Sequence, residues 1–118
     1  MQRFIKSVRY ALCGWRLFFS KEKNGQIQFT VAILTIILSF LLHLSSTEWI
    51  IILLCTIIVI SLEMINSVIE KLLDHLHPAH HEQVQWVKDV AAGSVLWAAL
   101  ISAVIGSIIF IPKMIHLF

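Results

Sequence analysis

Long apolar segments separated by short polar ones dominate this 118-residue sequence. Three apolar segments stand out, at residues 27–45, 49–69 and 90–111. Their lengths match the roughly 20 residues that a helix needs to cross the hydrocarbon core of a bilayer. The pattern predicts an all-α integral membrane protein with three transmembrane helices, folded as a single domain over residues 1–118.

Residues 2–20 show a different pattern, in which apolar and basic residues are interleaved. At about 100° per residue, the apolar side chains collect on one arc of a helix and the basic ones on the opposite arc. We expect this amphipathic helix to lie in the membrane surface, although it could also be a simple anchor. The apolar arc contains Phe4, Ile5, Val8, Ala11, Leu12, Trp15, Phe18 and Phe19, and the basic arc contains Arg3, Lys6, Arg9 and Arg16.

The distribution of basic residues orients the chain in the membrane. Six of the nine Lys and Arg residues precede the first long apolar segment, and such an excess marks the cytoplasmic side. Three crossings then place the N-terminus inside and the C-terminus outside. The polar turn at residues 20–28 and the segment 70–89 are expected on the cytoplasmic side, and the third span is expected to end at Pro112 and Lys113.

Composition narrows the class of protein further. With 58% hydrophobic and only 14% charged residues, the chain is not an ordinary soluble domain. The formal net charge of +2 is modest, but the clustering of basic residues before the first span suits anionic lipid headgroups, and no nucleic-acid partner is expected. Cys13 and Cys55 lack the spacing of a zinc site or a disulfide framework.

Three polar residues lie at helical spacing within and directly after the second apolar segment. Glu63, Asn66 and Glu70 fall at i, i+3 and i+7 and therefore share one helix face. An ionisable group at membrane depth costs about 3 kcal/mol on insertion scales, so it usually faces a protein interior and serves a function. Glu63 could be the general base of an enzyme that acts on a lipid hydroxyl, or the proton-binding site of a small transporter; the spacing leaves both open.

Acidic residues on the expected cytoplasmic side suggest a metal site. Glu22 and Glu70 lie at similar depth, and one or two carboxylates completed by phosphate oxygens and water are how proteins generally hold magnesium. Glu63 is roughly 10 Å deeper by helical rise. Glu22 could instead be a solvated turn residue, and Lys88 and Asp89 could be phosphate ligands or an interfacial anchor with a helix cap.

Four histidines surround Pro78 in the segment between the second and third spans. Their spacing fits no fixed helical pattern, so we interpret them as a solvated, pH-sensitive loop and not as a metal site. They are His75, His77, His80 and His81.

Beyond these patterns, the residues carry a family resemblance. The run from Glu63 to Glu70 reads E-x-x-N-S-x-x-E, and Lys88-Asp89-Val-Ala-Ala-Gly follows further along the chain. Together with the basic N-terminal helix and the Glu22-x-Asn24 turn, the sequence resembles the prokaryotic diacylglycerol kinase and undecaprenol kinase family over nearly its whole length. Gly25 stands where an aromatic residue is common in that family, and the Val-Ala-Ala-Gly run resembles the undecaprenol kinase branch.

The resemblance implies a homotrimeric lipid kinase of the bacterial cytoplasmic membrane, with active sites between subunits. It would transfer the γ-phosphoryl group of ATP to diacylglycerol or undecaprenol, with Glu63 as general base and substrate-binding residue. Glu22 and Glu70 would hold Mg²⁺ and Asn66 would support them, while Lys88 would come from a neighbouring subunit. The resemblance places Arg3, Tyr10, Glu22, Asn66, Glu70, His80, His81, Lys88 and Asp89 around ATP. Phosphoryl transfer requires positioning, charge neutralisation and a base, and these residues supply them without a Walker motif.

Overall fold

The computed structural model describes residues 1–117, which form four helices. Three of them are long and apolar enough to cross a membrane. The all-helical architecture and the three candidate spans are therefore confirmed. The helices are α1 (Gln2–Lys21), α2 (Lys23–Leu41), α3 (Ser46–Leu76) and α4 (Glu82–Leu117).

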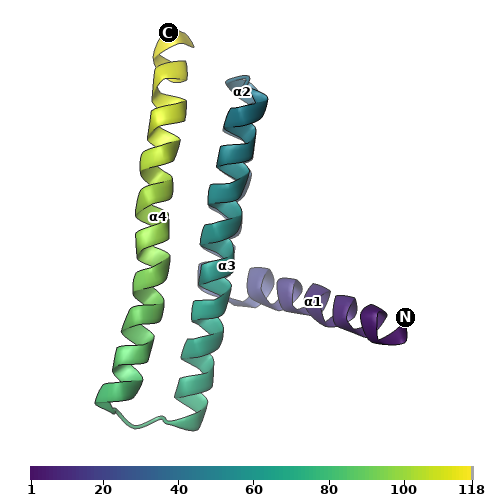
Figure 1. The fold of residues 1–118 in the computed structure, drawn as a ribbon, viewed down its shortest axis with the longest axis vertical. Coiled ribbons are helices and arrows are strands. Elements are labelled where there is room, and N and C mark those ends of the chain that lie inside the picture. Colours follow the sequence, from purple (N-terminus) through teal and green to yellow (C-terminus); the bar gives the residue numbers. More distant parts are fainter. Residues whose placement is uncertain (118) are drawn as a thin grey trace.

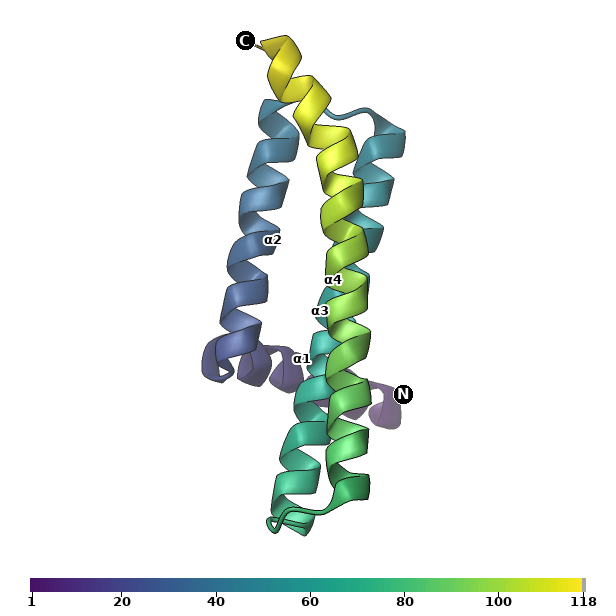
Figure 2. The ribbon, with the colours of Figure 1, turned by 90° about the vertical axis from the view of Figure 1, so that its left-hand side faces the viewer.

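The three long helices lie side by side with their axes roughly aligned, and α1 points away from them. Helices α3 and α4 form an antiparallel hairpin, with α2 packed against α3 (Figures 1 and 2). Helix α1 projects sideways from the bundle partway along α3, so that the α3–α4 hairpin extends well past the level of α1. Helix α1 and the bundle of three long helices are thus distinct parts of one chain.

A tight corner joins α1 to α2. Only Glu22 separates the two helices, with an extended backbone at φ −92° and ψ 128°. A Cβ atom at Gly25 would lie 2.1 Å from the Phe18 carbonyl oxygen, so no larger residue fits there without moving the backbone. The predicted polar turn at residues 20–28 is therefore wrong in extent: most of it is helical, and the glycine lets the two helices approach closely.

The connection from α2 to α3 is defined by caps at both ends. The backbone N–H groups of Leu44 and His43 donate to the carbonyls of Ser39 and Phe40, both at 3.3 Å, which is the Schellman arrangement. His43 adopts a left-handed conformation at φ 53°. Ser45 then caps α3 reciprocally with Glu48, which satisfies backbone donors that the helix start leaves free.

Both helices of the hairpin continue beyond the predicted spans. Helix α3 reaches Leu76 and α4 begins at Glu82, so His75 is helical and the connection is shorter than the predicted loop. At its other end, α4 continues through Pro112 instead of ending there. The missing proline N–H disturbs a helix without necessarily ending it, and Figure 2 shows the C-terminal end of α4 bending.

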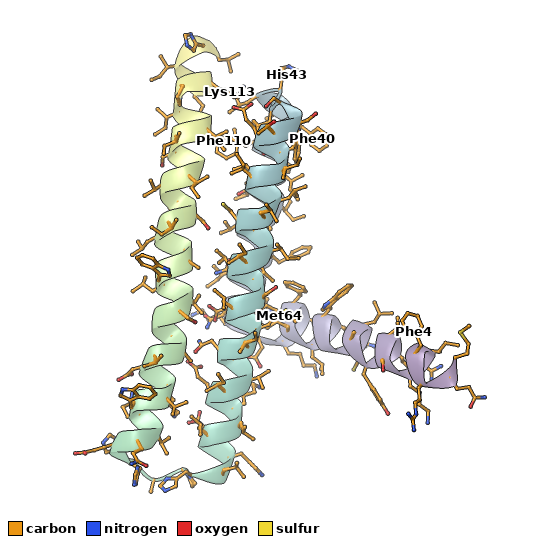
Figure 3. The ribbon with its side chains drawn as sticks, in the orientation of Figure 1. Phe4, Phe40, His43, Met64, Phe110 and Lys113 are labelled. Carbon is orange, nitrogen blue, oxygen red and sulfur yellow. The ribbon has the colours of Figure 1, made fainter. Side chains whose placement is uncertain are left out.

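An apolar cluster packs the α2–α3 connection against α3 and the C-terminal part of α4. It comprises Leu42, Leu44, Ile52 and Ile109, from the connection, α3 and α4. Lys113 and Glu48 form an ion pair at 3.1 Å beside it, and Figure 3 shows Phe40, His43, Phe110 and Lys113 at this same end.

Candidate active site

The predicted polar face of α3 turns into the protein. Glu63 is 6% exposed and Asn66 is 5% exposed, although most of α3 around them is apolar. Glu70 lies further along the same face and is half-buried. Figure 3 shows Met64, the neighbour of Glu63, at the level where α1 leaves the bundle. The α1–α2 corner and this face of α3 therefore meet.

The corner supplies a partner for the buried carboxylate. Asn24, in the first turn of α2, donates a hydrogen bond from Nδ2 to Oε1 of Glu63 at 2.9 Å. The bond links residues that are 39 positions apart in the sequence. The spacing of residues within α3 gave no sign of it.

Asn66 and Glu70 form a weaker pair one turn further along α3. Asn66 donates from Nδ2 to Oε1 of Glu70 at 3.4 Å. The Oδ1 atom of Asn66 is buried and has no hydrogen-bond partner among residues 1–117. Because buried polar atoms are nearly always paired, this acceptor points to a group that a single chain does not supply.

Glu22 contacts α3 through a residue that the sequence pattern did not single out. Lys71 Nζ lies 2.6 Å from Glu22 Oε1, and Lys71 directly follows Glu70 in α3. The corner residue is therefore tied to the helix that carries Glu63 and Glu70. A basic residue next to a proposed metal ligand was the available signal for this contact.

The remaining predicted site residues are not gathered around Glu63 within one chain. Lys88 pairs with Asp74 across the α3–α4 hairpin, and Asp89 accepts a hydrogen bond from Gln85 at 2.8 Å. Arg3 and Tyr10 are exposed along α1. His80 and His81 lie in the hairpin connection, where the His81 ring contacts His77.

The acidic residues fit a magnesium ion that the protein binds only in part, with substrate phosphates and water as its other ligands. Within the described part of the chain, no three His, Cys, Asp or Glu side chains lie together as a metal site. Magnesium is usually held by one or two carboxylates together with substrate phosphates and water. Glu22, Glu70 and the unpaired oxygen of Asn66 are oxygen donors of the right kind for such a site.

A cleft of about 520 Å³ opens between α2, α3 and α4. Gln28 and Val59 line it, and each is one helical turn from a member of the Asn24–Glu63 pair. The rest of its lining is mostly apolar or small, including Ala99, Ala103 and Gly106. The buried carboxylate therefore lies near one end of an apolar space.

The structure thus combines three helices long and apolar enough to cross a membrane with a buried carboxylate that an amide from another helix holds. The sequence model of the family described as prokaryotic diacylglycerol kinase matches residues 9–110. An undecaprenol kinase from Bacillus subtilis (strain 168) is 39% identical over 97% of this chain and 93% of its own length.

Two further relatives are diacylglycerol kinases. The protein from Synechocystis sp. is 30% identical over 96% of this chain and 65% of its own length. The protein from Haemophilus influenzae is 29% identical over 93% of this chain and 94% of its own length. The chain belongs to the prokaryotic diacylglycerol kinase family and is a lipid kinase. This finding favours the enzyme over the transporter that the sequence pattern left open.

Proposed function

We propose that this protein transfers the γ-phosphoryl group of ATP to the hydroxyl of a membrane lipid, either diacylglycerol or undecaprenol. The observation that carries the proposal is the burial of Glu63 in an apolar helix, held by an amide from the α1–α2 corner. The 39% identity to an undecaprenol kinase makes undecaprenol the first lipid to test.

Glu63 acts as the general base in this proposal. A carboxylate within reach of a hydroxyl can accept its proton as the oxygen attacks the phosphoryl group. The lipid presents its hydroxyl at Glu63 while its hydrocarbon chain remains among apolar residues. The cleft that begins one turn away, at Gln28 and Val59, suits such a chain.

Mg²⁺ and ATP bind next to Glu63, at Glu22 and Glu70. Bound magnesium would neutralise charge on the phosphates, which is a main requirement of phosphoryl transfer. The unpaired oxygen of Asn66 is placed to accept a hydrogen bond or to bind the hydrated ion. Lys71, which pairs with Glu22, would have to release it when Glu22 binds the metal.

The nucleotide contacts require more than one chain. Lys88 and Asp89 are occupied within their own hairpin, and Arg3 and Tyr10 lie along the projecting α1. We propose a homotrimer in which Lys88 of a neighbouring subunit, with Arg3, Tyr10, His80, His81 and Asp89, completes the ATP site. The enzyme would reside in the bacterial cytoplasmic membrane, with its N-terminus in the cytoplasm and its C-terminus outside.

The test is transfer of labelled γ-phosphate to each lipid, using purified protein in mixed micelles. Replacing Glu63 by Gln removes the base while preserving the shape of the side chain, so kcat should fall by roughly 100- to 10,000-fold. Glu48→Gln is the matched control, because it makes the same change at the far end of α3. Full activity in Glu63→Gln would overturn the role of Glu63 as base, and no transfer to either lipid by the wild type would overturn the proposed substrates.

A further inference from the structure

The hydrogen bond between Asn24 and Glu63 leaves the carboxylate held by one side only. Asn24 donates to Oε1 at 2.9 Å. Within residues 1–117, Glu63 receives no other side-chain hydrogen bond, even though Asn66 and Ser67 are buried on the same helix. One carboxylate oxygen is thus fixed by an amide, and the other is left for a further group.

The backbone around Asn24 is built to hold the amide in place. Gly25 allows the corner to close against the carbonyl of Phe18, and Phe18 itself is buried. Asn24 therefore extends from a constrained backbone toward Glu63.

The chemistry of an amide suits a positioning role. An N–H donor stabilises the ionised form of a carboxylate, which is the form that accepts a proton. An amide stays neutral, so it neither competes for the proton nor adds a charge in the bilayer. A carboxylate held through one oxygen keeps a fixed orientation, and small errors in orientation at a reacting centre are costly.

We infer that Asn24 is a positioning residue, which holds Glu63 through Oε1 so that Oε2 faces the lipid hydroxyl. This inference rests on the proposed function, because it gives Asn24 a role only if Glu63 is the base. Asn24 touches neither ATP nor the reacting phosphorus in this scheme. Its loss should therefore lower kcat and leave the KM for ATP nearly unchanged.

Three substitutions at Asn24 separate its donor from its shape. Asn24→Ala removes the donor, and kcat should fall roughly 10- to 100-fold, as expected for a lost hydrogen bond to a charged group. Asn24→Asp keeps the shape but places an acceptor against the carboxylate, so its kcat should fall further. Asn24→Gln retains a donor on a longer side chain and should recover part of the loss in Asn24→Ala.

Gln26→Ala is the matched control, since it removes an amide from the same corner that bonds to a backbone carbonyl and not to Glu63. Its kcat should stay within about threefold of the wild type, because the Gln26 amide does not contact Glu63 and the close approach of Gly25 to Phe18 is unchanged. Equal losses in Gln26→Ala and Asn24→Ala would overturn the inference in favour of a merely structural corner. Wild-type kcat in Asn24→Asp would overturn it as well.

A spectroscopic measurement tests the contact without turnover. The infrared carboxylate band that disappears in Glu63→Gln should shift in Asn24→Ala and stay in place in Gln26→Ala. An unshifted band would contradict the inference even in a variant that folds poorly and has little activity. Absence of transfer by the wild type would defeat the proposed function, and a fully active Glu63→Gln enzyme would defeat the role of Glu63 as base. An inactive Glu63→Gln with fully active Asn24 variants would defeat only the role of Asn24.

Discussion

Helix α3 passes through two clusters of opposite character. Near its start, Ile52 belongs to the apolar cluster formed with Leu42, Leu44 and Ile109. About three turns further on, Glu63 belongs to a polar cluster formed with Asn24, Asn66 and Glu70. Both clusters join α3 to the end of a neighbouring helix or connection.

The two clusters differ in whether one chain completes them. Around the apolar cluster the helix caps are paired and Glu48 bonds to both Ser45 and Lys113. In the polar cluster, the bond from Asn66 to Glu70 is long and the second oxygen of Asn66 has no partner within residues 1–117. The N-terminal end of α3 is therefore completed by contacts within one chain, whereas the part of the helix around Glu63 keeps polar groups that fit a ligand.

Among the changes that compare the two clusters, the largest effect is predicted at the corner that supports the polar cluster. Gly25→Ala places a methyl group against the Phe18 carbonyl, so the corner must open and carry Asn24 and Glu22 away from α3. A displacement of about 1 Å near a reacting centre can cost about 100-fold in rate. We expect a loss of that order in kcat, measured by phosphate transfer to lipid.

Gly14→Ala is the control for this change, because an added Cβ at Gly14 would meet nothing within 4 Å. Alanine is also the better helix former, so the variant should keep its activity. Equal activity in the Gly25→Ala and Gly14→Ala enzymes would show that the corner does not position the polar cluster. The difference between the two clusters along α3 would then have no consequence for activity.

A smaller effect is predicted for the apolar cluster, and it concerns stability. Ile109 is 9% exposed, whereas its neighbour Ile108 is 67% exposed. In a bilayer the apolar side chains outside the protein meet lipid, so the loss at Ile109 comes mainly from the cavity left behind. Ile109→Ala should lower the free energy of unfolding by about 1–3 kcal/mol.

The comparison with Ile108→Ala is made by unfolding both variants with denaturant in mixed micelles. Ile108→Ala should change stability by less than about 0.5 kcal/mol, and both variants should retain kcat at a temperature where they are folded. A large loss of kcat in folded Ile109→Ala would mean that the apolar cluster also helps to position the polar cluster around Glu63.

The same division explains what the sequence could predict. Hydropathy identified the three long helices, because bilayer thickness sets their minimum length. The spacing of Glu63, Asn66 and Glu70 identified the buried face of α3, since it depends only on helical geometry. These predictions succeed because each depends on residues that are close together in the sequence.

Contacts between distant residues were beyond the sequence pattern. The bond from Asn24 to Glu63 depends on a corner that only a glycine at position 25 permits. Lys88 was expected to bind phosphate, yet within one chain it pairs with Asp74. The ends of α3 and α4 also lie beyond the predicted spans, because a helix can extend past the membrane through charged residues, which hydropathy alone excludes from the span.

The smallest predicted effect tests how much the α2–α3 connection, which borders the apolar cluster, contributes to stability. His43 lies at φ 53°, a left-handed conformation that costs a residue with a Cβ about 1–2 kcal/mol. Glycine adopts it without strain but loses more freedom on folding. His43→Gly should therefore stabilise the protein by about 0.5–1 kcal/mol, measured by denaturant unfolding in micelles, with kcat unchanged. Leu41→Gly, at an exposed helical position in the same turn, should instead destabilise it by about 1 kcal/mol. If His43→Gly proved less stable than the wild type, the histidine side chain would have to stabilise the protein by more than its backbone strain costs. The apolar cluster would then depend on a polar side chain, as the polar cluster does.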